Sequence, residues 1–358
     1  MIEYGTDQNP DLLAALRTGD WLDAQHFPPL RYAVPGILPE GSTLLVGPPK
    51  IGKSWAVLDL LLAIAAGGRA LGAIPTGEAR PVLYLALEDG NRRLQDRCRK
   101  LLAGEPIPKY FHYLTRIPPG RVLDVVAEWT ERNPDAAAVV LDTLGKVMPP
   151  ALIGESAYQR DYRVGGRLKL LADERAGLAL LTNHHDRKAG SEDFVDSVSG
   201  THGLAGAADT ILVLTRQRQE TDGVLKITGR DVAEGEYALT FADGMAWQVS
   251  GGDLAKAAEQ ARTARLTGDL GDRSAAIVTF VNSHAEGVRA GDVADHLGID
   301  EKQTGEYLRR LEKSGRIARW SRGVYGSTHT PVGNVGSVGT DEPEPTLPTL
   351  PTALQEGS

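Results

Sequence analysis

Eight consecutive residues near the start of the chain have the spacing of a loop that binds nucleotide phosphates. They fit the pattern G-x-x-x-x-G-K-[ST] without a mismatch. They are Gly47, Pro48, Pro49, Lys50, Ile51, Gly52, Lys53 and Ser54. The glycines allow backbone N–H groups to turn inward around phosphate oxygens, and the helix that begins near Lys53 directs its positive dipole end at the same anion. Lys53 is expected to reach the β- and γ-phosphates and Ser54 to hold Mg²⁺, so the pattern predicts ATP and Mg²⁺ as ligands.

The residues on either side of this loop predict the elements that must position it. Residues 44–46 form a short apolar run, typical of a buried parallel strand. Residues 55–66 are mostly apolar helix formers, and Gly67 and Gly68 follow as a helix stop. A strand, a glycine-rich loop and a helix in this order are the context of a phosphate-binding loop. The alternative is a strand–helix turn that binds nothing.

Polar side chains end three further apolar runs, which are predicted to be strands of the same sheet. Glu88, Asp142 and the pair His184 and His185 each follow such a run. In open α/β sheets, ligands lie at the carboxyl ends of the strands. Glu88 can there accept a proton from an attacking water, and Asp142 can position Mg²⁺ through its water shell. One of the histidines can sense the γ-phosphate. Helix capping is the alternative for the carboxylates, and a purely structural role is the alternative for the histidines.

The composition bounds the class of protein. The chain has 358 residues, enough for about two domains of ~150 residues each. Its formal net charge of −8 means that nucleic-acid contacts must come from local basic clusters. The single cysteine, Cys98, excludes an intramolecular disulfide framework and a multi-cysteine zinc site. The N-terminus lacks the pattern of a signal peptide, and the apolar run 58–66 is too short to cross a bilayer. We therefore expect a cytoplasmic protein without membrane contact.

The order of elements predicts an α/β domain followed by a smaller module. Strands alternate with helices over residues 41–250, which favours a central, mostly parallel sheet with helices on both faces. A helix is expected at residues 11–25, docked on its own domain or on a neighbouring subunit. The other segments are predicted to be a lead-in, a linker, a small second module and a disordered tail, at residues 1–40, 251–272, 273–326 and 327–358.

The small module has the element order of a winged helix-turn-helix, with three helices followed by two short strands. Between residues 309 and 322, six Lys or Arg residues accompany one acid, Glu312. This local excess is what a surface that contacts phosphates needs, and Arg316, Arg319 and Arg322 are the candidates for contacts with duplex DNA. Because the whole module is near neutral, a winged helix that binds protein is the alternative.

Taken in order, the motifs resemble those of the RecA-like hexameric ATPases, most closely the plasmid RepA type of replicative helicase. The resemblance rests on four segments and covers about residues 35–250; the segments are residues 47–54, 84–89, 140–144 and 182–188. It implies a RecA-like P-loop NTPase fold and a homo-oligomer, a hexameric ring. It also implies roles for Glu88 as catalytic base, for Asp142 as the Walker B acid and for His185 as the sensor.

The same resemblance implies an active site shared between subunits. Arg230 falls where these ATPases place an arginine finger, which stabilises charge on the transferring phosphoryl group and can contribute about 10³–10⁵ in rate. The relatives usually have a lysine two residues earlier, where this chain has Thr228. Within residues 41–200 the sequence indicates no second cation for the γ-phosphate. A surface ion pair is the alternative role for Arg230.

Two loops would face a central channel by the same resemblance. One follows His185 and carries Arg187 and Lys188, which would contact single-stranded DNA. The other follows Asp142 and leads to further arginines: Arg160, Arg163 and Arg167. The sequence therefore predicts a ring ATPase that translocates on or unwinds DNA in the replication of a mobile element. The rival hypotheses are an ATP-switched DNA-binding regulator or loader and an ATPase scaffold that binds only protein.

Overall fold

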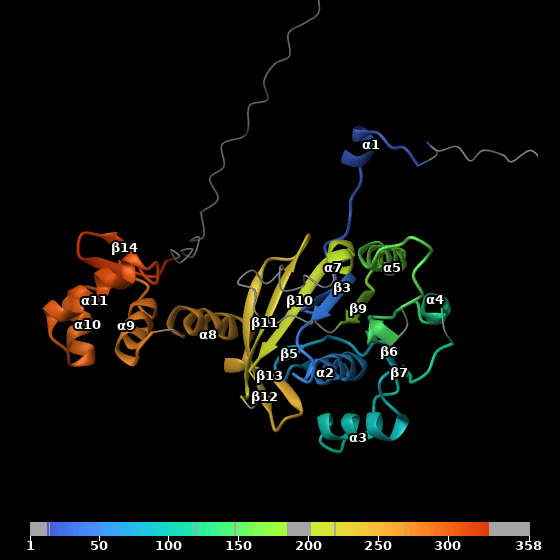
Figure 1. Cartoon of the computed structure of the whole chain (residues 1–358), viewed down its shortest axis with the longest axis horizontal. Helices are drawn as coiled ribbons and strands as arrows, with labels where there is room; N and C mark the ends of the chain where they lie inside the picture. The colour runs from blue at the N-terminus through green and yellow to red at the C-terminus, as the bar shows by residue number, and fades with distance from the viewer. Residues whose placement is uncertain are drawn as a thin grey trace, which may run out of the picture. The chain divides into compact units, whose positions relative to one another are not determined.

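The computed structural model describes residues 13, 15–118, 120–146, 148–184, 202–217, 220–268 and 270–328 (Figure 1). The chain divides into two compact units, Met1–Arg262 and Thr263–Ser358. Within the described residues, no helix is both long and apolar enough to cross a membrane. The predicted tail, residues 327–358, lies almost wholly outside the described part of the chain.

A nine-stranded sheet forms the centre of the first unit, in the order β13-β12-β11-β10-β3-β9-β8-β6-β7. The strands from β10 to β7 in this order are parallel, and β11, β12 and β13 add an antiparallel extension. The strands are β3 Gly41–Val46, β6 Val82–Ala86, β7 Phe111–Leu114, β8 Ala138–Asp142, β9 Ala179–Asn183, β10 Thr210–Arg216, β11 Asp222–Gly229, β12 Gly235–Ala242 and β13 Ala246–Val249. The predicted mostly parallel sheet is confirmed.

Two apolar layers cover the faces of this sheet. Alternate residues of each central strand enter different layers: on β6, Tyr84 packs with one layer, whereas Leu83 and Leu85 pack with the other. The first layer contains α2 and α3, and the second contains α4, α5 and α7. The helices are α2 Lys53–Ala66, α3 Asn91–Leu101, α4 Val122–Arg132, α5 Ala157–Asp173 and α7 His202–Ala207. Because both faces are covered, the central strands are apolar throughout rather than alternating.

Short elements complete the first unit. They are α1 Gly19–Asp23, β1 Tyr32–Val34, β2 Leu38–Pro39, β4 Arg69–Ala70, β5 Ile74–Pro75, the 3-10 turns η1 Leu144–Lys146 and η2 Ser250–Gly252, and the start of α8 Leu254–Thr267. The helix expected over residues 11–25 is wrong in length, because α1 has five residues and none of them is buried. Helix α8 lies within the segment that we predicted to be a linker.

The second unit has its own small core. Helices α9 Asp272–Asn282, α10 Ala290–Leu297 and α11 Glu301–Lys313 precede the hairpin of β14 Ala318–Ser321 and β15 Val324–Gly326. Apolar side chains from all three helices and from the hairpin form one cluster: Ile277, Val278, Val281, Val288, Val293, Leu308, Leu311, Ile317 and Tyr325. The predicted order of three helices and a two-stranded wing is confirmed.

Candidate nucleotide-binding site

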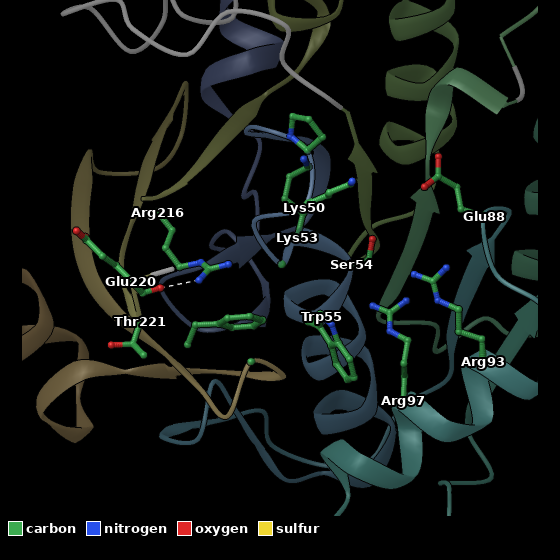
Figure 2. Close-up of a pocket in the computed structure, with 14 residues that line it drawn as sticks. Lys50, Lys53, Ser54, Trp55, Glu88, Arg93, Arg97, Arg216, Glu220 and Thr221 are labelled. Carbon is green, nitrogen blue, oxygen red and sulfur yellow. Dashed lines mark hydrogen bonds between the residues drawn. The ribbon is translucent and has the colours of Figure 1, made fainter. Parts of the chain in front are cut away.

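A cavity of about 790 Å³ opens at the carboxyl edge of the parallel strands, beside the phosphate loop (Figure 2). Its walls come from the loop and the start of α2, from the segment that joins β6 to α3, and from the antiparallel extension of the sheet. The lining residues are Pro49, Lys50, Gly52, Lys53, Ser54, Trp55, Glu88, Arg93, Arg97, Arg216, Glu220, Thr221, Phe241 and Gly244. The structure therefore brings most of the predicted phosphate loop and Glu88 to one cavity.

The two glycines of the phosphate loop allow close contacts with other strands. A Cβ atom on Gly47 would lie 2.3 Å from the carbonyl oxygen of Leu214, in β10. A Cβ atom on Gly52, whose φ is 104°, would lie 2.9 Å from Nε1 of Trp247. That indole nitrogen donates a hydrogen bond to the Gly52 carbonyl at 3.1 Å. Strands β10 and β13 thus hold the loop against the sheet, and only glycine fits at both positions.

Lys53 lies folded over the loop that precedes it. Its ammonium donates hydrogen bonds to the carbonyl oxygens of Gly47 at 2.6 Å and Pro48 at 3.0 Å, and the residue is 3% exposed. Ser54, in the first turn of α2, faces the same cavity. A buried ammonium and a hydroxyl group at a helix N-terminus are groups that bind phosphate oxygens and a phosphate-bound Mg²⁺.

Asp142 is buried behind the cavity in a network that the sequence did not indicate. Its Oδ2 accepts a hydrogen bond from the Tyr84 hydroxyl at 2.6 Å, and its Oδ1 accepts one from Asn183 Nδ2 at 2.6 Å. Burial, together with the Asp142 carboxylate, raises the pKa of Tyr84 well above 10, so that the phenol remains a donor. Both donors fix the orientation of the carboxylate, which argues against the capping alternative for Asp142.

Glu88 connects the cavity to this network. The hydroxyl of Thr143, the residue after Asp142, donates a hydrogen bond to Glu88 Oε1 at 3.1 Å. Among the described residues, no cluster of three or more acidic, histidine or cysteine side chains can by itself hold a metal ion. Mg²⁺ in nucleotide sites typically uses one or two protein ligands together with phosphates and waters. Ser54 and Asp142 fit that donor set.

Asp89, the neighbour of Glu88, has a different environment. Its carboxylate binds Arg93 at 3.0 Å and Arg97 at 2.5 Å, and its side chain is 4% exposed. Each of its two oxygens is thus occupied by a guanidinium group. Arg93 and Arg97 both line the cavity, so residues 41–200 bring two further arginines to the site that were not predicted from the sequence. Their spacing of four and eight residues from Asp89 places them on one helix face, a signal present in the sequence.

Arg97 and Arg216 lie on opposite sides of the cavity (Figure 2), and each lies close to an aromatic ring that also lines it. The guanidinium of Arg97 lies 4.6 Å from the ring centroid of Trp55, and that of Arg216 lies 4.7 Å from the ring centroid of Phe241. Arg216 also donates a hydrogen bond to the Glu220 carbonyl at 2.6 Å. Flat cationic and aromatic surfaces of this kind bind planar, anionic ligands such as nucleotides. Arg216 was not predicted from the sequence to be part of the site.

Arg230 lies at the other edge of the sheet of its own chain. Arg230 follows the end of β11, and this end pairs with the start of β10. Because β10 and β3 are parallel, Arg230 lies near the starts of these two strands, whereas the phosphate loop follows the end of β3. Its guanidinium donates to the Gly206 carbonyl at 3.2 Å and lies 3.8 Å from Asp209, with the side chain 60% exposed. The structure therefore does not bring Arg230 to the cavity of its own chain.

The histidine segment is described only in part. The backbone N–H of His184 donates to the Leu45 carbonyl at 2.8 Å, which places this residue beside the phosphate-loop strand. His185, Arg187 and Lys188 lie outside the described residues.

Helix α5, which follows the loop after Asp142, presents an aromatic pair. Tyr158 and Tyr162 are 55% and 52% exposed, and their rings stack at 6.2 Å between centroids with an interplanar angle of 17°. The nearby Arg163 is neutralised by Glu155, at 2.7 and 2.8 Å. Arg167, on the same helix, is exposed, so this surface combines an aromatic pair with a basic side chain.

The three candidate arginines of the second unit have different environments. Arg316 donates hydrogen bonds to the carbonyl oxygens of Arg265 at 3.0 Å and Leu266 at 2.9 Å, in the last turn of α8. Arg319 and Arg322 are exposed on the wing. Arg316 therefore has a structural contact, whereas the other two remain available for phosphate groups.

Fold and cavity together define a P-loop ATPase with a RecA-like α/β fold and a winged-helix unit. The sequence model of the AAA domain family matches residues 9–191, more than half of the chain, and the chain belongs to this family. A second family model, described as FaeA-like protein, matches residues 273–326. Among solved structures, the crystal structure of the RadB recombinase is similar, with 16% identity, a TM-score of 0.40, and coverage of 60% of this chain and 92% of that chain. No curated protein matches the chain.

Proposed function

We propose that this chain is a ring-forming ATPase that hydrolyses ATP with Mg²⁺ and acts on DNA as a RepA-type helicase or translocase in the replication of a mobile element. One observation carries the catalytic part of the proposal. Glu88 and the phosphate loop line the same cavity, and Thr143 links Glu88 to the buried Asp142. A proton acceptor, a phosphate cradle and a fixed carboxylate are the parts that phosphoryl transfer to water requires.

Each residue has a distinct proposed role. The inward backbone N–H groups of the loop and the ammonium of Lys53 bind the triphosphate. Glu88 accepts the proton of the attacking water, with its carboxylate oriented by the Thr143 hydroxyl. Ser54 and Asp142 would hold Mg²⁺, which when bound neutralises charge on the phosphates. Tyr84 and Asn183, through their 2.6 Å hydrogen bonds, keep Asp142 oriented toward that position.

The arrangement of Arg230 supports a site shared between subunits. It is 60% exposed at the edge of the sheet away from its own cavity, so a neighbouring chain can approach it. We therefore propose it as an arginine finger in trans, with His185 as the γ-phosphate sensor. The proposed DNA contacts are Arg187 and Lys188 for a single strand in the channel and the exposed Arg319 and Arg322 for duplex DNA at the wing.

ATP turnover and nucleotide binding test the catalytic assignments. Lys53→Ala should abolish nucleotide binding or turnover with the fold intact. Glu88→Gln should retain bound ATP but lower turnover by about 10²–10⁴, because an amide is a poor proton acceptor. Glu78→Gln changes an exposed glutamate outside the cavity and is the matched control. Turnover of Glu88→Gln near that of Glu78→Gln would refute the assignment of the base.

One observation favours a second candidate function, an ATP-switched regulator or loader without processive unwinding. Arg93, Arg97 and Arg216 of the same chain already line the cavity, so cationic side chains are present at the site without a neighbouring chain. An assay of ATP turnover after mixing the Arg230→Ala protein with the Glu88→Gln protein distinguishes the ring ATPase from the switched regulator. A shared site restores part of the activity at interfaces with one intact Arg230 and one intact Glu88, whereas full activity of Arg230→Ala favours the switch. Strand displacement on a forked duplex is expected only of the helicase.

A further inference from the structure

The second unit carries a groove of about 770 Å³ where the start of α9, the turn between α10 and α11, and one side of α11 meet (Figure 1). We call it the α9–α11 groove. Three of its side chains, Leu297, Ile299 and Tyr307, are half-buried and pack against the small core, so they give the groove an apolar floor. The lining residues are Gly271, Asp272, Arg273, Ser274, Ala276, Leu297, Gly298, Ile299, Tyr307 and Arg310.

Arg310 is held in position at this groove without being neutralised. Its guanidinium lies 4.9 Å from the ring centroid of Tyr307 and donates a hydrogen bond to Ser274 Oγ at 3.2 Å. Among the described residues, neither Arg310 nor the exposed Arg273 has a carboxylate partner. One acid, Asp272, lines the same groove. A preorganised guanidinium beside an apolar floor suits a ligand that carries both carboxylates and apolar side chains.

The C-terminal segment, which lies outside the described residues, has this complementary composition. Residues 329–358 contain four acids and no Lys or Arg, and three of the acids fall at positions 341, 342 and 344. Directly after them, the triplet Pro-Thr-Leu occurs twice and Pro-Thr-Ala once, over residues 345–353. Proline at every third position favours polyproline II, which has three residues per turn, so Leu347 and Leu350 would share one edge. Segments of this kind dock on grooves that contain aromatic side chains.

The length of chain between the second unit and these acids matches the distance to the groove. Tyr325 of β15 pairs with Val288, shortly after the end of α9, whereas the groove lies at the start of α9. A helix of 11 residues is about 16 Å long. The thirteen residues that follow Thr328, up to Asp341, include three glycines, and a chain of that length spans roughly 18–22 Å. A tether whose span matches the separation gives the highest effective concentration, so even a weak contact is occupied.

We propose that residues 341–351 dock in the α9–α11 groove of their own second unit and thereby compete with duplex DNA for that unit. The three carboxylates pair with Arg273 and Arg310, and the leucine edge contacts the apolar floor. Residues 272–326 contain nine Lys or Arg and eight Asp or Glu, so a docked acidic segment reverses the sign of the net charge of the unit. The competition with DNA rests on the duplex contact of the proposed function, whereas the docking does not.

Photo-crosslinking of the full chain tests the docking. Thr349→Cys places a thiol in the segment for a benzophenone label. Cys98 is buried, and burial raises its pKa to about 11, so the label should react with the new thiol alone. On irradiation, the label should attach to residues 271–310 of the same chain, with a yield that does not depend on protein concentration.

Charge changes in the groove give the matched comparison. Arg273→Glu with Arg310→Glu should lower the yield of attachment in the groove by roughly fivefold to tenfold. Both side chains are exposed, so this pair removes no core contact. Arg309→Glu with Lys313→Glu makes the same change of charge on exposed side chains that do not line the groove, and should leave the yield unchanged.

Reversal of the charges in the segment completes this test. Asp341→Arg with Glu344→Arg should by itself lower the yield, and in the chain that carries the two groove changes it should restore part of it. Attachment spread along the chain irrespective of these changes, equal losses in the groove variant and its control, or attachment only between two copies would overturn the proposal.

Binding to duplex DNA tests the competition and separates its failure from that of the proposed function. Glu342→Gln with Glu344→Gln should tighten duplex binding by roughly threefold to tenfold at low salt, and the gain should shrink as salt is added. Glu356→Gln, outside the docking segment, should leave the affinity unchanged. Equal affinities for the double variant and the parent would refute the competition. Attachment in the groove without any duplex binding would refute the proposed DNA contact and leave the docking in place.

Discussion

Asp59, in the middle of the phosphate-loop helix α2, gives the sharpest quantitative prediction. Its carboxylate accepts a hydrogen bond from the backbone N–H of Leu71 at 2.6 Å. Burial raises the pKa of Asp59 from 3.8 to about 7, although the hydrogen bond from Leu71 acts in the opposite direction. The folded chain therefore holds the Asp59 proton more tightly than the unfolded chain does. Asp59→Asn keeps an oxygen acceptor for Leu71 but cannot ionise.

The sign and size of the effect follow from this difference. The stabilisation by the bound proton is fully present below about pH 4, where Asp59 is protonated in both states, and is lost as the pH rises through about 7. A rise of the pKa from 3.8 to about 7 corresponds to about 4 kcal/mol at most. Because Asp59 is only half-buried, solvent reduces the cost to roughly 2–4 kcal/mol. Asp59→Asn should therefore be more stable than the parent by this amount above about pH 8 and nearly equal to it near pH 4.

Chemical denaturation at a series of pH values measures this difference. The free energy of unfolding of Asp59→Asn minus that of the parent should grow by up to about 1.4 kcal/mol per pH unit between pH 4 and 7 and then level off. Asp96→Asn, in a side chain that is 59% exposed, is the control and should show no such growth. A difference that stays constant across this range would refute the conclusion that Asp59 holds its proton more tightly in the folded chain.

Three further predictions concern the nucleotide and DNA contacts. Arg216→Ala should weaken binding of a fluorescent ATP analogue by roughly tenfold to a hundredfold, since a charge-assisted hydrogen bond is lost, whereas Arg230→Ala should leave binding unchanged. Arg316→Ala should lower the melting temperature of the second unit by several degrees, because two carbonyl groups of α8 lose their donor. Arg322→Ala should instead weaken binding to duplex DNA and reduce the slope of log affinity against log salt concentration by about one. Tyr158→Ala should reduce stimulation of ATP turnover by single-stranded DNA with basal turnover unchanged, because base stacking contributes about 1–3 kcal/mol; equal loss of basal turnover would contradict this role.

The fold could be predicted where local signals and burial agree. The central strands are apolar throughout because both faces are covered, and this pattern predicted them. Helix α11, the third helix predicted for the small module, has clear local signals: Asp300 caps its start, accepting a hydrogen bond from Gln303 N at 2.9 Å, and Gly315 follows its end. The N-terminal helix was overestimated because an amphipathic pattern forms a stable helix only when its apolar face is buried. In the described structure that face has no cover within its own chain.

The site could be predicted only where a residue ends a strand. Glu88 and Asp142 carry that signal. Tyr84 lies inside a strand and has the appearance of a core residue; only the parallel register of β6 on β8, which pairs Ala86 with Asp142, brings its hydroxyl to that carboxylate. Arg216 reaches the cavity because β10 runs parallel to β3, and the sequence does not show which strand neighbours the phosphate loop. Sheet order is a long-range property, so residues that depend on it were missed.

Helix α3 contributes two cationic side chains, Arg93 and Arg97, to the nucleotide cavity. Arg97 is also tied to Asp89, which immediately follows Glu88. A nucleotide that contacts these arginines would therefore bind to the helix and to the segment that carries Glu88 at once. If the proposed oligomer completes the same site, nucleotide should promote assembly, and assembly should tighten nucleotide binding. A nucleotide affinity that is the same in monomer and oligomer would show that the site and the subunit contact are not coupled.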